Sequence, residues 1–202
     1  MMGNESGDLS RQKGDVQSMW AENLARRIIE MEPGQHECFI YESELEHQLI
    51  LTSYIGYGLE LGQKVVYVAD SHSARTIANY LWDDGIKVEE FLSRGQFLLL
   101  TSDAAYLTDG VFDPERMIFS LGVQTEKAIA EGYSALRATG EMSWVLRGGK
   151  IEDLLIDYET MLNDFLAGSN CMALCQYDRR KFDPKMLQTI RAIHAEPPDS
   201  LI

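Results

Sequence analysis

Polar and aromatic side chains that could bind a ligand follow the strands that the sequence predicts. Asp70 ends one short apolar run and is followed by His72, and Glu141 follows another such run. In parallel α/β sheets, ligands bind beyond the carboxyl ends of the strands, where the loops converge. We therefore expect a small-molecule site at that edge, lined by some of the side chains near the strand ends, namely Tyr41, Asp70, Glu141, Met142, Trp144 and Tyr177.

These residue types also serve purely structural roles, and the sequence alone leaves the choice open. Small-molecule sites are usually apolar pockets with a few polar contacts, but a single aromatic side chain more often belongs to the core. Glu141 could orient a ligand, or it could form an ion pair with Arg137 or cap a helix. Asp70 and His72 could begin a metal site, but a metal ion would need further ligands from distant loops. We expect no catalytic residue, no metal ligand and no cofactor.

The turn after the first predicted strand reads YESELEHQ, over residues 41–48. A phosphate-binding loop needs glycines, free helix amides and a lysine, and this turn has neither glycine nor lysine. Ser43 and Glu46 fit a capping box, in which both side chains satisfy amides that a phosphate would otherwise use. Glu42 and Glu44 add negative charge at the positive end of the helix dipole. The turn therefore disfavours a nucleoside triphosphate.

Short apolar runs alternate with longer helical patterns. The runs predict strands at 36–41, 64–69, 96–101, 134–139 and 171–177. Helix start signals lie between them, at Ser73, Asp113, Ile151 and Asp183. Nearly continuous apolar strands separated by helices indicate a parallel sheet covered on both faces. The predicted fold is a three-layer α/β sandwich with a mainly parallel sheet of five or more strands.

The sequence predicts three segments of unequal length. Residues 1–16 are small, polar and charged, and we expect them to be disordered. Residues 17–33 predict an amphipathic helix, which could pack as an arm or contact a second copy. Residues 36–202 predict one α/β domain. The connection around Asp109 and Gly110 is long, so it could be a lid over the site or a packed loop.

Charge and hydropathy limit the partners. The chain has 202 residues and a formal net charge of −14, which repels nucleic acids and anionic membranes. No apolar run approaches the roughly 18 residues that span a bilayer, and the first residues lack the apolar core of a signal peptide. We expect a cytoplasmic protein that binds neither nucleic acid nor membrane.

The three cysteines are too few, and odd in number, for a disulfide framework. Cys171 and Cys175 fall in one predicted strand, where residues four apart lie roughly 13 Å apart, too far to share a metal ion. Buried thiols are the simpler interpretation. The sequence places no histidine near Cys38 or Cys175, and three histidines are expected to be solvated or structural: His36, His47 and His194.

Several motifs, in a fixed order, resemble one known family. They are HECFIYES at 36–43, GLELGQKVVYVAD at 58–70, ATGEMSW at 138–144, DYETMLN at 157–163 and ALCQYDRRKF at 173–182. Together they resemble the MEDS domain, the methanogen/methylotroph, DcmR-like sensory domain. The resemblance implies a single sensory domain over 36–202, a divergent RecA/KaiC-like fold, and binding of small molecules such as hydrocarbon derivatives.

The same resemblance assigns expected places to two acids. Asp70 lies where a KaiC-like protein has a catalytic acid, and Glu141 follows the strand that would be the Walker B strand. Other members carry DNA-binding or kinase modules. The residues before His36 hold at most one good helix, so we expect a stand-alone sensory module whose output passes through a partner or a second copy of the chain.

Three functions are left open. The first is a small-molecule sensory domain for signalling or transcription-related regulation in one-carbon or hydrocarbon-derivative metabolism. Its candidate partners are a small organic ligand, a second copy and a signalling protein. The second is a nucleotide-binding or Mg²⁺-dependent enzyme with a degenerate ATPase site, in which Asp70 or Glu141 holds Mg²⁺ and phosphate contacts Arg179, Arg180 or Lys181. The third is a protein-interaction scaffold with an empty site. We favour the first and expect no enzyme activity.

Overall fold

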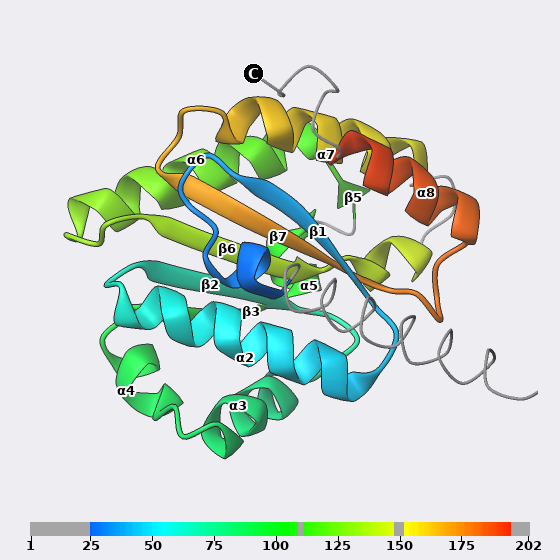
Figure 1. Cartoon of the computed structure of the whole chain (residues 1–202). Coiled ribbons are helices and arrows are strands. Elements are labelled where there is room, and N and C mark those ends of the chain that lie inside the picture. Colours follow the sequence, from blue (N-terminus) through cyan, green and yellow to red (C-terminus); the bar gives the residue numbers. More distant parts are fainter. Residues whose placement is uncertain (1–24, 109–110, 148–151, 195–202) are drawn as a thin grey trace, which may run out of the picture.

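The computed structural model describes residues 25–108, 111–147 and 152–194. Its centre is a sheet of five parallel strands in the order β1, β7, β6, β2, β3 (Figure 1). The strands are β1 (His36–Tyr41), β2 (Lys64–Ala69), β3 (Phe97–Thr101), β6 (Leu136–Glu141) and β7 (Cys171–Asp178). The predicted α/β fold with a parallel sheet is confirmed.

The strand predictions match β1 and β2 and are displaced by two residues at β6. Gly140 and Glu141 pair with Cys175 and Gln176 of β7, so they belong to the strand and not to the loop after it. Glycine usually weakens a strand, but here the hydroxyl of Tyr106 lies against it. A Cβ on Gly140 would lie 2.3 Å from that oxygen. Glu141 is therefore held by backbone pairing at the end of the sheet.

Helices cover both faces of the sheet (Figure 1). One face carries α2 (Glu44–Glu60), α3 (Ala74–Asp83) and α4 (Val88–Ser93), and the other carries α6 (Pro114–Ala130), α7 (Glu152–Leu166) and α8 (Pro184–Ile193). Four of these helices begin after a side chain that accepts a hydrogen bond from the first turn, as the sequence predicts: Ser43, Ser73, Asp113 and Asp183. Among the described residues, no helix combines the length and the apolar character needed to cross a membrane.

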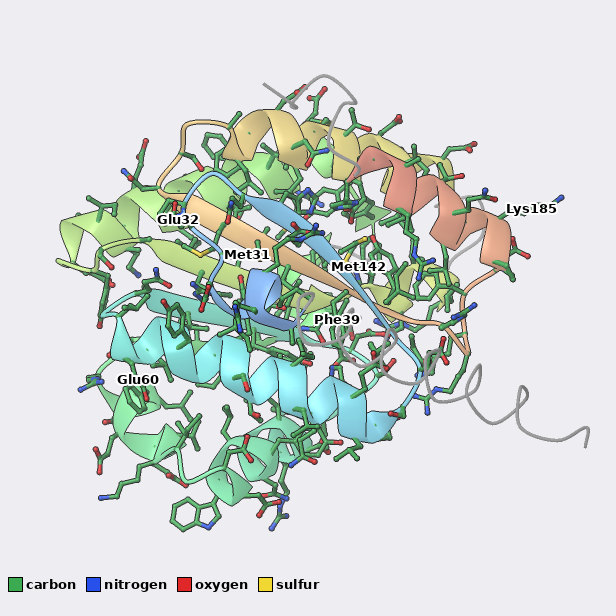
Figure 2. The ribbon with its side chains drawn as sticks, in the orientation of Figure 1. Met31, Glu32, Phe39, Glu60, Met142 and Lys185 are labelled. Carbon is green, nitrogen blue, oxygen red and sulfur yellow. The ribbon has the colours of Figure 1, made fainter. Side chains whose placement is uncertain are left out.

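Each face of the sheet has its own apolar core. Leu81 of α3 is buried between the sheet and the layer of α2 to α4, and Leu162 of α7 is buried between the sheet and the layer of α6 to α8. Figure 2 shows Phe39 and Met142 inside these layers and Lys185 on the outside of α8. The core therefore fills both spaces between sheet and helices, as a three-layer sandwich requires.

The segment before β1 packs against the sheet. Residues 25–29 are helical, and both Ile28 and Met31 are buried. The buried guanidinium of Arg137 donates to the carbonyl oxygens of Ile29 at 3.2 Å and Met31 at 2.8 Å, and its Nε donates to Gln63 at 2.6 Å. Two roles were expected for this helix, a packing arm or a contact with a second copy, and these contacts match the packing arm. Its first residues and the segment 1–16 lie outside the described residues.

The long connection after β3 folds onto the core. It contains the short helix α5 (Ser102–Ala105) and the two-residue strands β4 (Leu107–Thr108) and β5 (Val111–Phe112). Tyr106 stacks on Trp144 with 4.9 Å between ring centroids, and Phe112 lies 4.5 Å from the same ring. The described part of this connection matches the packed loop, while the Asp109 and Gly110 turn lies outside the described residues.

Candidate functional site

The carboxylate of Glu141 organises the polar end of the sheet. Its Oε2 accepts hydrogen bonds from the backbone amides of Asp70 at 3.2 Å, Ser71, and His72 at 3.0 Å. Its Oε1 accepts from the Tyr67 hydroxyl at 2.5 Å and lies 3.0 Å from Nδ1 of His72. Burial raises the pKa of Glu141, but the hydrogen bonds from His72 and Tyr67 outweigh it and hold that pKa below its usual value. The group is a buried carboxylate with donors on both oxygens.

This arrangement fills an anion site from within the chain. Consecutive amides before a helix commonly bind phosphate or carboxylate ligands. Here the amides of residues 70–72 precede α3, and the side chain of Glu141 occupies them. The ion pair between Glu141 and Arg137, one of the structural roles expected for this acid, does not form, because Arg137 contacts Gln63 and the N-terminal segment instead.

Asp70 forms a second polar group beside Glu141. Its Oδ1 accepts from Ser102 at 2.5 Å and from Arg147 at 2.5 Å, and its Oδ2 accepts from Ser143 at 2.7 Å. Ser143 lies in the 3-10 helix η1 (Met142–Arg147), directly after β6, and its hydroxyl is 2.5 Å from that of Ser71. We call Asp70, His72, Glu141 and Ser143 the carboxyl-end cluster.

Aromatic rings close the cluster on the α2 side. His72 Nε2 lies 2.7 Å from a carboxylate oxygen of Glu44, and its ring stacks on His47 with 4.5 Å between centroids. Tyr41 lies on the far side of His47 at a centroid distance of 4.5 Å. His47 is itself buried, and its Nε2 lies 2.6 Å from the side-chain oxygen of Gln176.

The turn after β1 is capped as predicted, with one difference. Ser43 Oγ accepts from the amide of Glu46 at 3.2 Å, but Glu46 Oε2 accepts from the amide of Glu42 at 2.8 Å, one residue before the cap. The cations expected to serve as phosphate ligands already have acidic or polar partners. Arg179 pairs with Glu42, Arg180 with Glu44 and Asp178, and Lys181 with Ser71.

The six residues from which the lining of one pocket was expected do not gather in one place. Asp70 and Glu141 lie side by side, but the other four are buried by packing: Tyr41, Met142, Trp144 and Tyr177 are at most 2% exposed. Tyr41 packs in the core under α2, whereas the other three pack under α6 to α8. Successive strand residues point to opposite faces, and η1 turns Met142 and Trp144 back into the core. The expectation of a single shared rim was wrong, and ligand contact at these side chains stays a prediction.

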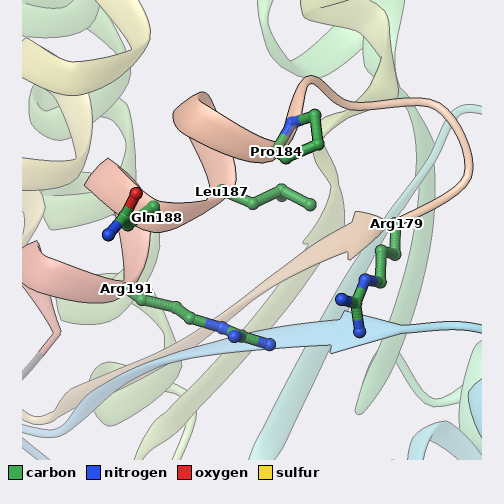
Figure 3. A pocket seen from close by; sticks show the side chains of 5 residues that line it. All are labelled: Arg179, Pro184, Leu187, Gln188 and Arg191. Carbon is green, nitrogen blue, oxygen red and sulfur yellow. The ribbon is translucent and has the colours of Figure 1, made fainter.

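A surface groove and a small core cavity lie away from the carboxyl-end cluster. Figure 3 shows the groove, of about 350 Å³, beside α8, where it is lined by Arg179, Pro184, Leu187, Gln188 and Arg191. The core cavity is much smaller, about 40 Å³, and lies inside the α6 to α8 layer. The residues around this core cavity are mostly apolar and come from the sheet and its covering elements, and they include Val66, Val68, Tyr106, Ala138, Ala173 and Cys175.

Sequence reasoning missed a second buried group of titratable side chains. His36 and His194 were expected to be solvated or structural, with no histidine near Cys175. In the structure both imidazoles are buried against Glu159, and His36 Nε2 lies 3.5 Å from the Cys175 sulfur. Burial lowers the pKa of His36 to about 4. Burial also lowers that of His194, but hydrogen bonds with Cys38 and Glu159 outweigh it and raise the pKa to about 10.

One signal for this group was present in the sequence. His36 and Cys38 are two apart on β1, so their side chains leave the same face of the sheet. Cys38 also lies opposite Cys175 of β7 in the register. Glu159 and His194 come from α7 and from the end of α8, so no local pattern connects them to this strand.

The parallel sheet, its helical layers and the altered phosphate turn define a RecA-like α/β domain. A solved KaiC-like protein from the hyperthermophilic archaeon Pyrococcus horikoshii OT3 has this fold, with a TM-score of 0.55 and 15% sequence identity over 78% of this chain and 68% of that chain. Residues 35–195 match the model of the MEDS family, the MEthanogen/methylotroph, DcmR Sensory domain, and the chain belongs to that family. No curated protein matches it.

Proposed function

We propose that this domain senses a small organic molecule and that the ligand occupies the core cavity beside Tyr106. Membership of a sensory family supports a regulatory role. The observation that carries the site is the cavity itself, about 40 Å³ next to the carboxyl half of the sheet. Protein cores are close-packed and keep few voids larger than a water molecule. A space of this size in the middle of the domain is therefore a candidate for a specific occupant.

The size of the cavity limits the ligand. The space admits roughly one to three non-hydrogen atoms. Its walls are mainly aliphatic, with the tyrosine rings of Tyr106 and Tyr158 and the thiol of Cys175. This lining suits a one-carbon compound or another short hydrocarbon derivative with one weakly polar group. Because the best small ligands gain about 1.5 kcal/mol per heavy atom, such a molecule binds with a Kd of about 1 mM or weaker.

The cavity is connected to parts of the domain that could report its occupancy. Tyr106 borders the cavity and stacks on Trp144, whose buried Nε1 has no hydrogen-bond partner among the described residues. Gly140 also borders it and precedes Glu141, which holds the loop before α3. A ligand that favours one position of Tyr106 would shift the populations of both neighbours, and such a shift is what sensing requires.

The nucleotide-binding or Mg²⁺-dependent alternative has less support. It needs cations and amides that are free to meet phosphate. Arg179 and Arg180 are paired with acids, and the amides of residues 70–72 are occupied by Glu141. The scaffold alternative has support only from the many buried contacts of the expected pocket residues. We therefore retain sensing as the proposed function, with signalling through a second copy or a signalling protein.

Tryptophan fluorescence tests the proposal directly. The sequence contains three tryptophans, so replacing Trp20 and Trp82 by phenylalanine leaves Trp144 as the sole reporter. Titration of this parent with methanol or dichloromethane in the millimolar range should give a saturable change. Ala173→Val, which fills the cavity wall, should abolish it. Ala135→Val, a buried alanine in the opposite core, is the matched control and should keep it.

Two results would contradict a ligand in the core cavity. A response in the parent that never saturates, or one that survives in Ala173→Val at full amplitude, places the ligand elsewhere. A saturable response to Mg²⁺-ATP instead would favour the nucleotide alternative.

A further inference from the structure

A triangle of two imidazole nitrogens and one carboxylate oxygen lies buried on the α6 to α8 face of the sheet. His36 Nε2 and His194 Nε2 are 3.3 Å apart, and Glu159 Oε2 lies 3.3 Å from the first and 3.2 Å from the second. The three side chains are 2%, 3% and 0% exposed, in the order His36, His194 and Glu159. We propose that these three atoms bind a divalent transition-metal ion, with Zn²⁺ as the best match.

The outer hydrogen bonds fix both imidazoles with Nε2 toward the centre. His194 Nδ1 lies 2.8 Å from the carbonyl oxygen of Ile190, which can only accept, so Nδ1 carries a proton. His36 Nδ1 lies 2.7 Å from the side-chain oxygen of Asn163. Asn163 donates its own NH₂ to the carbonyl of Ile193, and this orients its oxygen toward His36. In the neutral form of each ring, Nε2 is therefore a lone pair facing the triangle.

Glu159 completes the set in the same manner. Its Oε1 accepts from the hydroxyl of Tyr177 at 2.6 Å, while the buried Oε2 faces Nε2 of His36 at 3.3 Å and Nε2 of His194 at 3.2 Å. Buried charges normally pair or coordinate metals, so this oxygen requires either a protonated imidazole or a metal ion. Outer-shell partners of this kind, a carbonyl, an amide and a hydroxyl, are what orient the ligands in metal centres.

The spacing fits a metal better than it fits a hydrogen-bonded group. Zn²⁺ binds nitrogen and oxygen ligands at about 2.0 to 2.1 Å, so the ligand atoms of a tetrahedral site lie roughly 3.3 to 3.4 Å apart. The three measured separations are 3.2 to 3.3 Å. The Cys175 sulfur, 3.5 Å from His36 Nε2, is the nearest candidate for the fourth position. Two imidazoles, a carboxylate and a thiolate form a donor set that Zn²⁺ commonly takes.

A second group of possible ligands, beside the carboxyl-end cluster and sharing His72 with it, fits less well. Glu44, His47 and His72 also lie close enough to offer three atoms to one ion. The two imidazoles there are stacked, with only 10° between their planes, so their nitrogen lone pairs run side by side instead of converging. Glu44 is also 54% exposed and already pairs with Arg180. The buried triangle of His36, Glu159 and His194 is therefore the stronger site.

Binding there would tie together three distant parts of the chain. His36 begins β1, Glu159 lies in α7, and His194 follows the last residue of α8. The metal ion would hold the end of α8 against the edge strand of the sheet. Because a metal that binds only the folded chain adds its binding free energy to folding, loading the site should raise the Tm in proportion to the logarithm of the free metal concentration.

The test uses the full chain and three variants. Metal analysis of the protein, followed by chelation and titration with Zn²⁺ and Co²⁺, should give one equivalent per chain. Bound Co²⁺ should show the visible bands of a tetrahedral site, with a sulfur charge-transfer band when Cys175 is the fourth ligand. Glu159→Gln and His194→Gln should each weaken binding at least tenfold and lose the metal-dependent rise in Tm. His72→Gln, which breaks the competing group, should bind as the wild type does.

Three results would overturn the assignment. They are the absence of one-equivalent binding of either metal to the chelated wild type, unchanged binding in both Glu159→Gln and His194→Gln, and loss of binding in His72→Gln. The two triangle variants act on different elements, α7 and the end of α8. If one fails to fold, the other therefore still decides the question.

Discussion

The hydrogen bonds of Glu141 predict a large stability loss for a small change in shape. Glu141→Gln keeps the size of the side chain and removes its charge. In the variant, the amide oxygen can still accept from the backbone amides of residues 70–72. The NH₂ group, however, faces the Tyr67 hydroxyl and Nδ1 of His72, which in the wild type donate to Oε1 of Glu141. Two hydrogen bonds to a carboxylate are lost or must be rebuilt, and three lose charge assistance.

The magnitude follows from these bonds. Each lost or weakened hydrogen bond costs about 0.5 to 1.5 kcal/mol, and removing the buried charge recovers part of the desolvation cost, so we expect about 2 to 3 kcal/mol in total. For a domain of this size that corresponds to a fall in Tm of roughly 4 to 12 °C. Urea unfolding followed by circular dichroism gives the free energy of unfolding at constant m-value.

Asp103→Asn is the matched control, because it makes the same change at a side chain that is 71% exposed and lies 3.4 Å from Arg147. We expect this control to stay within about 0.5 kcal/mol of the wild type. If Glu141→Gln also stays within about 0.5 kcal/mol, the loop before α3 is not held by the carboxylate and the reasoning fails.

Three further predictions concern single residues. Burial lowers the pKa of His72, but hydrogen bonds to two carboxylates outweigh it and raise that pKa. The contribution of His72 to stability is therefore complete below its unfolded pKa of about 6.5 and is lost as pH rises through the folded pKa. The wild type should therefore exceed His72→Gln by more at about pH 5.5 than at about pH 8.5 in urea unfolding, and an equal difference would contradict this. Gly140→Ala should push the Tyr106 hydroxyl away, lower stability by about 1 to 3 kcal/mol and remove the Trp144 response, whereas a variant with normal ligand response would argue against the cavity. Arg137→Met should cost about 2 to 4 kcal/mol in urea unfolding because three oxygen acceptors, of which those of Gln63 and Met31 are buried, lose their donor. A loss below about 0.5 kcal/mol would show that the N-terminal segment does not need this donor.

Local signals made much of the fold predictable. Ser73 and Asp113 start helices because a side chain that accepts from the first turn leaves a signature within a few residues. An apolar run located β2 for a similar reason, since a strand buried on both faces needs a continuous apolar sequence. The parallel sheet then follows from the alternation of strands and helices.

The candidate sites depended on contacts that no local pattern contains. A tryptophan at position 144 is compatible with a pocket wall and with the core. Only the turn of η1 in the structure places its side chain in the core. The Glu141 carboxylate could be placed at the edge of the sheet, but its amide partners come from another loop. The triangle of His36, Glu159 and His194 joins an edge strand to two helices that follow much later in the chain, so its chemistry becomes visible only in three dimensions.

The most direct test of the sensing proposal is methyl NMR on protein labelled at its alanine methyl groups. Ala138 and Ala173 line the core cavity, whereas Ala128 and Ala135 are buried away from it and serve as internal references. Titration with methanol or dichloromethane should produce saturable shifts at the first pair, with a Kd of about 1 mM or weaker, and little change at the second. Shifts that grow linearly at all four methyl groups, or none at Ala138 and Ala173, would contradict a ligand in this cavity.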